Sequence, residues 1–133
     1  MAALIDSSVL IDVERRRLSL EDLLAKHAEE EVAIAAITAS ELLHGVHRAT
    51  KARHRAPREA FVESVLANVA IIPFDFVAAR IHARLWAQLA AKGLIVGTHD
   101  LLIAATALAI GFTVATRDER SFPHIPGLSL VRW

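Results

Sequence analysis

Four carboxylates that lie far apart in the chain each stand beside an apolar segment, and together they form what we call the acid quartet: Asp6, Glu41, Asp100 and Asp118. Three of them follow apolar runs, which cover residues 2–5, 32–37 and 112–115, and Asp100 opens the apolar stretch 101–110. If the three runs are parallel strands, their acids lie just past the strand ends, where open α/β sheets bind ligands. Several carboxylates in one crevice repel one another unless a cation lies between them. The pattern therefore predicts a divalent-metal site and a metal-dependent enzyme.

The elements that would position the acid quartet follow from the hydrophobic pattern. Strands are expected over residues 2–5, 32–37, 69–72, 112–115 and 128–131. Helices are expected between them, with caps at Ser7 or Ser8, Ser19, Thr38, Asp75 and Thr98, and with Pro57 at the first position of one more helix. Strands that alternate with helices in this way predict an α/β fold with a mainly parallel sheet.

Composition favours a single domain over residues 1–133. The length is close to the common size of one domain, 54% of the residues are hydrophobic, and five glycines and four prolines leave no linker. No cysteine is present, which excludes disulfides, thiolate metal sites and thiol nucleophiles. The formal net charge is zero, so any attraction to nucleic acid must come from local clusters of basic residues.

Neither export nor a membrane is expected from the hydropathy pattern. No basic residue precedes Arg15, as a signal peptide would need, and Asp6 and Asp12 interrupt the apolar start. The longest apolar stretch, residues 101–112, is too short to span a bilayer. We therefore expect a cytoplasmic protein without a membrane partner, with which the lack of cysteine is compatible.

Each member of the acid quartet also has a purely local explanation. Asp6 suits a helix N-cap, Glu41 suits the capping-box partner of Thr38, Asp100 suits the first turn of a helix, and Asp118 suits a turn. These local explanations do not predict that all four acids should gather at one edge of one sheet, whereas a metal site does. Carboxylate oxygens are hard ligands that suit Mg²⁺ or Mn²⁺ better than zinc, for which His44 and His47 would lack a third partner.

Four segments resemble the motifs of PIN-domain ribonucleases, and specifically of the VapC-type toxins of bacterial toxin–antitoxin pairs. The first, residues 4–11, reads Leu-Ile-Asp-Ser-Ser-Val-Leu-Ile, and the second, residues 37–46, reads Ile-Thr-Ala-Ser-Glu-Leu-Leu-His-Gly-Val. The third, residues 99–107, reads His-Asp-Leu-Leu-Ile-Ala-Ala-Thr-Ala. The fourth, residues 114–118, reads Val-Ala-Thr-Arg-Asp and is followed by Phe122 and residues 125–128. The resemblance spans nearly the whole chain in the family's order, apart from about residues 49–69.

The resemblance implies a fold, an activity and partners. The fold would be a three-layer α/β/α PIN-like sandwich around a mainly parallel sheet of four to five strands. The activity would be endoribonuclease cleavage, with the acid quartet as catalytic and metal-binding residues around one or two Mg²⁺ or Mn²⁺ ions. The partners would be RNA, a second copy of the chain in a homodimer, and a cognate VapB-type antitoxin that neutralises the toxin. The alternative is a catalytically silent PIN-like module that only binds a partner protein.

Basic residues near the acids allow two interpretations. Arg48, Lys51, Arg53, Arg55 and Arg58 crowd eleven residues, and residues 15–17 form a second basic run. They are either solvated helix faces or phosphate contacts that flank the acidic crevice. We name as candidate substrate contacts the residues Thr116, Arg117, Arg48, Arg53 and Arg55. With five phenylalanines, two tryptophans and no tyrosine, base stacking on aromatic side chains is not expected to dominate binding.

Overall fold

Five parallel strands form the central sheet of the computed structural model, which describes residues 1–133. In chain order they are β1 (Ala2–Ile5), β2 (Glu31–Ala35), β3 (Ala70–Ile72), β4 (Thr113–Thr116) and β5 (Leu130–Arg132). Across the sheet their order is β3-β2-β1-β4-β5, and every neighbouring pair is parallel. The predicted α/β fold with a mainly parallel sheet of four to five strands is therefore confirmed.

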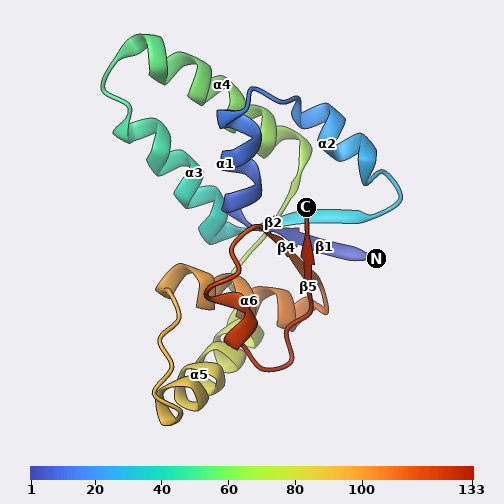
Figure 1. Ribbon diagram of the computed structural model, residues 1–133, viewed down its shortest axis with the longest axis vertical. Helices are drawn as coiled ribbons and strands as arrows, with labels where there is room; N and C mark the ends of the chain where they lie inside the picture. The colour runs from blue at the N-terminus through green and yellow to red at the C-terminus, as the bar shows by residue number, and fades with distance from the viewer.

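Helices cover both faces of the sheet, as Figure 1 shows. They are α1 (Ser7–Arg15), α2 (Leu20–Lys26), α3 (Ala36–Arg48), α4 (Ala52–Asn68), α5 (Phe76–Ala91) and α6 (Thr98–Ile110), with a 3-10 turn over Phe122–His124. Helices α1 to α4 lie on one side of the sheet, and α5 and α6 lie on the other (Figure 1). This is the expected three-layer α/β/α sandwich. None of the six helices combines the length and the hydropathy that a bilayer crossing requires.

The alternation of side chains along the strands divides the core into two clusters. Leu4 and Ala35 pack with residues of α5 and α6, whereas Ile5 and Ile34 pack with residues of α1, α3 and α4. A strand that is covered by helices on both faces is apolar at consecutive positions, which is why β1 and β2 are short uninterrupted apolar runs in the sequence. The two helical layers therefore have separate cores, which are joined through the sheet and where α3 contacts α6.

The order of the strands creates a crevice at the end of β1. Strands β2 and β3 are added along one edge of β1, and β4 and β5 are then added along its other edge. Such a reversal leaves a ligand-binding crevice at the carboxyl ends of the strands beside it. Asp6 follows β1 directly and Asp118 lies just beyond β4, so the topology places both acids at this crevice.

Three helix starts differ from those predicted, and for two of them the reason is that a strand leads into the helix with almost no loop. Helix α3 begins immediately after β2, so Thr38 lies inside it and forms no capping box. Helix α1 begins at Ser7, which leaves Asp6 rather than Ser7 or Ser8 in the N-cap position. Helix α6 has Gly97 in that position and Thr98 as its first residue.

The prediction for Pro57 is also wrong, since this proline lies inside α4 rather than at its start. A proline there leaves the carbonyl of Arg53 without its helical N–H donor. The first turns of α4 are exposed throughout, so water can hydrate that carbonyl. The caps predicted at Ser19 and Asp75 are confirmed, because each side chain accepts a hydrogen bond from a backbone N–H in its helix.

Candidate functional site

Asp6 directly follows β1 and is almost fully buried, with 3% of its surface exposed. It occupies the N-cap position of α1, but its side chain accepts no hydrogen bond from a backbone N–H of that helix. Its Oδ2 atom instead accepts hydrogen bonds from Ser8 Oγ at 2.7 Å and from Thr116 Oγ1 at 2.9 Å. The local explanation of Asp6 as a helix cap therefore does not account for its carboxylate, which is held by a side chain of α1 and by one at the end of the neighbouring strand β4.

The two hydroxyl groups that hold Asp6, which we call the hydroxyl pair (Ser8 and Thr116), also lock the end of β4. Ser8 Oγ accepts a hydrogen bond from the Arg117 N–H at 3.0 Å, and Thr116 Oγ1 accepts one from the Asp118 N–H at 2.9 Å. The two oxygens lie 3.3 Å apart. Sequence reasoning selected Thr116 but treated Ser8 only as a helix cap, because its role depends on contacts with residues more than a hundred positions away.

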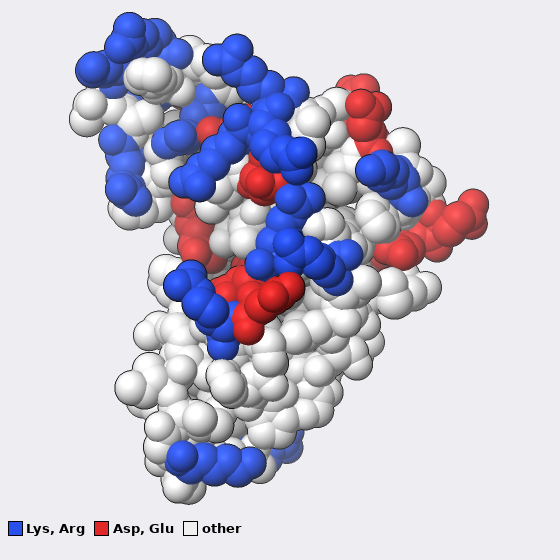
Figure 2. Space-filling view, viewed as in Figure 1, with Lys and Arg blue, Asp and Glu red and all other residues white.

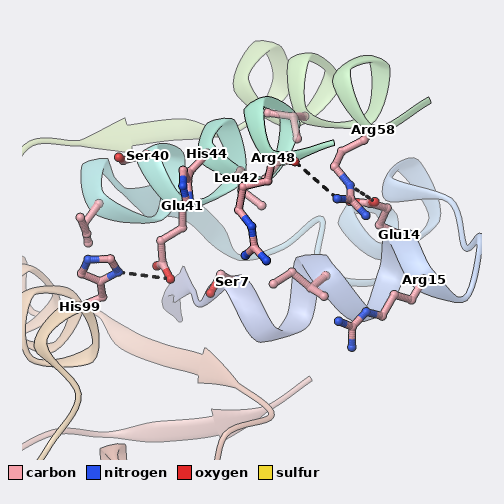
Figure 3. A pocket seen from close by; sticks show the side chains of 14 residues that line it. Ser7, Glu14, Arg15, Ser40, Glu41, Leu42, His44, Arg48, Arg58 and His99 are labelled. Atoms are coloured by element: carbon pink, nitrogen blue, oxygen red, sulfur yellow. Dashed lines mark hydrogen bonds and ion pairs between the residues drawn. The ribbon is translucent and has the colours of Figure 1, made fainter. Parts of the chain in front are cut away.

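Glu41 reaches the crevice from α3. Its Oε2 atom lies 3.5 Å from Nδ1 of His99, and the two side chains point toward each other in Figure 3. Its Oε1 atom is buried and has no hydrogen-bond partner. Burial raises the pKa of Glu41, the charges of Asp6 and Asp100 raise it further, and His99 acts in the opposite direction. The carboxylate thus has one oxygen free for a ligand and is not used as a capping-box partner.

Asp100 reaches the crevice from the first turn of α6. Burial is the largest cause that raises the pKa of Asp100, and the charges of Asp6 and Asp118 add to it, whereas Ser121 and His99 lower it. A Cβ atom built at Gly97 would lie 3.2 Å from Asp100 Oδ2, closer than most real contacts allow. Glycine at position 97 therefore leaves room for this carboxylate, a requirement that sequence reasoning missed.

Asp118 has both a local role and a place in the crevice. Its Oδ1 atom accepts a hydrogen bond from the Arg120 N–H at 2.8 Å, so the local explanation as a turn residue is correct. Its charge nevertheless acts on Asp100, which places the two carboxylates in one electrostatic neighbourhood.

The acid quartet fits a hard divalent cation that keeps part of its water shell. No three His, Asp or Glu side chains lie close enough together to hold a metal ion by themselves, so any ion here would need ligands from water or substrate. Mg²⁺ commonly uses only one or two carboxylates together with water and substrate phosphates. The raised pKa values of Glu41 and Asp100 mean that the site favours added positive charge, whether protons or a cation. Oε1 of Glu41 accepts no hydrogen bond within the protein, so it is available to an ion or a water molecule.

The candidate substrate contacts fall in three different settings. Arg117 is already engaged, since its Nε donates to the Trp133 carbonyl at 2.6 Å and its Nη1 pairs with Asp12. Arg48 lines a cavity that also contains Glu41. Arg53 and Arg55 are exposed on the first turns of α4 and line no cavity that the acids share.

Comparison with known proteins identifies relatives over nearly the whole chain. The sequence profile of the PIN domain matches residues 3–128. Ribonuclease VapC1 of Rickettsia felis is 34% identical, over 98% of this chain and 96% of that protein. The tRNA(fMet)-specific endonuclease VapC of Salmonella typhimurium is 32% identical, over 75% of this chain and 74% of that protein. The crystal structure of VapBC2 from Rickettsia felis, bound to a DNA fragment from its promoter, contains a chain with a TM-score of 0.86 and 28% identity, covering 100% of this chain and 99% of that chain.

The raised pKa values predict how the stability of the metal-free protein depends on pH. Because Glu41 and Asp100 have higher pKa values in the folded than in the unfolded state, the folded state binds more protons between the two values. The free energy of unfolding should therefore fall as the pH rises from the unfolded-state to the folded-state pKa values. Above the folded-state values, the whole loss of stability should be present. The Asp100→Asn variant, measured by urea unfolding in EDTA, should be more stable than the wild type at neutral pH and show a flatter dependence. The matched control is Glu63→Gln on the exposed surface of α4, which should follow the wild type. A wild-type protein whose stability rises as the pH increases above the ordinary carboxyl range would contradict the prediction.

The hydrogen bonds of the hydroxyl pair predict a role for Ser8 in metal binding. Ser8→Ala should weaken the binding of Mn²⁺ by roughly 10–100-fold, as loss of an outer-shell partner typically does, because Asp6 loses its shortest hydrogen bond. Ser8→Thr should retain most of the affinity. The comparison variant is Ser7→Ala, which should lose less affinity because Ser7 donates only a long hydrogen bond of 3.5 Å, to the other oxygen of Asp6. Calorimetric titration with Mn²⁺ measures the effect, and equal losses for Ser7→Ala and Ser8→Ala would contradict it.

Proposed function

The chain belongs to the PIN-domain family, among the VapC ribonucleases, and on that premise we propose that the acid quartet holds the divalent metal ion with which it cleaves RNA. The protein is a ribonuclease and the toxin of a toxin–antitoxin system. The proposal takes residues 1–133 as one PIN domain. The observation that supports it most is that burial raises the pKa values of Glu41 and Asp100, and that the charges of the neighbouring acids of the quartet raise them further.

PIN-domain ribonucleases are generally metal-dependent, and the donor set supports Mg²⁺ or Mn²⁺ as the ion. All candidate ligand atoms in the quartet are carboxylate oxygens, and the chain has no sulfur ligand of the cysteine type. Asp6 and Asp100 are the direct ligands we favour, with Glu41 and Asp118 binding directly or through water.

Different side chains at the proposed site would orient the ligands and hold water for cleavage. When bound, the ion supplies positive charge for the phosphate and a water molecule of lowered pKa. The hydroxyl pair orients Asp6, and the space left by Gly97 admits the Asp100 carboxylate. The free oxygen of Glu41 is available to accept a hydrogen bond from water at the site. No side chain has to act as the nucleophile.

The partner is a cognate VapB-type antitoxin. Solved relatives include the VapBC2 complex of Rickettsia felis and the DNA-bound VapBC complex of Salmonella typhimurium, whose matching chain has a TM-score of 0.88 and 25% identity. We propose in addition that two copies of this chain associate through α5. Phe76, Val77 and Trp86 on this helix are 70%, 55% and 64% exposed, which is unusual for apolar side chains on a surface that stays in water.

Replacing one ligand tests the catalytic proposal directly. Asp100→Asn keeps the size of the side chain but removes its charge, so RNA cleavage in Mg²⁺ should fall by more than the roughly 10–100-fold that loss of an outer-shell partner costs. Cleavage of a fluorescent RNA measures the rate, and circular dichroism verifies the fold. The control is Glu63→Gln, which removes one exposed charge from α4. A folded Asp100→Asn protein with wild-type, metal-dependent activity would sink the proposal, and a wild type that never cleaves RNA would favour the silent binding module.

Introducing a charge on α5 tests the homodimer. Trp86→Glu should shift the protein from dimer to monomer in light scattering, because a carboxylate would have to be buried without a partner at the interface. The control is Leu18→Glu, which places the same charge at an exposed leucine outside α5. Loss of the dimer in both variants, or in neither, would remove α5 as the contact.

A further inference from the structure

A groove leads away from the acid quartet between α1, α3 and α4. Its cavity has a volume of about 400 Å³, with Glu41 and His99 at one end and Glu14, Arg15 and Arg58 at the other. Figure 3 shows the side chain of Arg48 between these two ends, projecting from α3 toward α1. The groove is thus continuous with one ligand of the proposed metal site, and its far half is lined by arginines.

The three arginines of the groove differ in whether their charge is already used. Arg58 donates from Nε to Glu14 Oε1 at 2.9 Å and from Nη1 to the Gly45 carbonyl at 3.4 Å, so it ties α4 to α1 and α3. Arg48 and Arg15 form no hydrogen bond or ion pair through their side chains anywhere in the structure. The free positive charge of the groove therefore resides on Arg48 and Arg15.

The charge of the surface is unevenly distributed around this groove. Figure 2 shows Lys and Arg side chains gathered above the central acids, over the part of the molecule built from α1, α3 and α4, whereas the part built from α5 and α6 is largely uncharged. Positive side chains beside an acidic metal site suit a polyanion that must bring one of its phosphates to the acids. The groove walls add serine and aliphatic side chains but no aromatic ring other than histidine, so they favour contact with the backbone over stacking with bases.

We propose that this groove carries the single-stranded RNA backbone on one side of the bond to be cut, with Arg48 and Arg15 contacting successive phosphates. The inference rests on the proposed function and narrows it, because it assigns phosphate contacts to Arg48 and Arg15 and removes them from Arg53 and Arg55. Arg58 acts as a positioning residue, which holds the three helices that form the groove.

The test compares two double variants that remove the same charge from different places. Arg15→Gln/Arg48→Gln empties the groove of free charge, and Arg53→Gln/Arg55→Gln is the matched control on the exposed start of α4. Both are made in the Asp100→Asn background, and binding of a fluorescent single-stranded RNA is measured by anisotropy over a series of salt concentrations. The groove variant should bind about tenfold more weakly or worse at low salt. The slope of log K against log salt should become shallower by about 1.4, since each phosphate contact to a single strand contributes about 0.7. In the control variant, the loss of affinity and the change in salt slope should each be less than half of those in the groove variant.

Three results would overturn the proposal. Equal losses in the two double variants would mean that the basic residues act as a diffuse field rather than through a groove. An unchanged salt slope in the groove variant would exclude phosphate contacts by Arg48 and Arg15. If the groove variant binds RNA as tightly as the parent protein but no longer binds a polyglutamate peptide, the groove recognises an acidic protein segment instead of RNA. The proposed function is judged separately, by metal-dependent RNA cleavage with Asp100 intact, so the groove can fail while the ribonuclease stands.

Discussion

The burial of carboxylates beside one another is the constraint on which the rest of the structure depends. Burial is the largest cause that raises the pKa values of Glu41 and Asp100, and the charge of the almost fully buried Asp6 adds to it. Such an arrangement persists only because the surrounding elements are fixed by other interactions. The two apolar cores and the parallel sheet supply that rigidity, and the hydroxyl pair transmits it to Asp6.

The acids come from every layer of the sandwich. Asp6 and Asp118 follow central strands, Glu41 belongs to the layer of α1 to α4, and Asp100 belongs to the layer of α5 and α6. No single element contains more than one of these acids. Seen within its own element, each acid therefore has only a local explanation. For Asp118 the local explanation is correct as well, since its side chain shapes a turn while its charge acts on Asp100. A local role and a role in the site are therefore compatible in one residue.

The sequence predicted the sheet and the crevice because both depend on apolar runs and on where acids follow them. It failed where geometry depends on contacts between distant residues. Ser8 resembled a helix cap because its bonds to Thr116 and to the Arg117 N–H join opposite ends of the chain. The capping-box spacing from Thr38 to Glu41 was misleading, because α3 starts directly from β2 and already contains both residues. Arg48 and Arg53 are neighbours in one basic cluster of the sequence, yet the start of α4 at Ala52 puts them on different helices.

The separation of the two cores has a consequence for how such a chain can diverge. A substitution in the core beneath α5 and α6 alters packing mainly on one face of the sheet, and it reaches the core beneath α1, α3 and α4 through the strands and through the contact of α3 with α6. The proposed dimer face and the proposed RNA groove lie on opposite layers, so substitutions can change one of them without changing the other. The acid quartet draws side chains from both layers. Substitutions in either layer can therefore change the distances between its carboxylates.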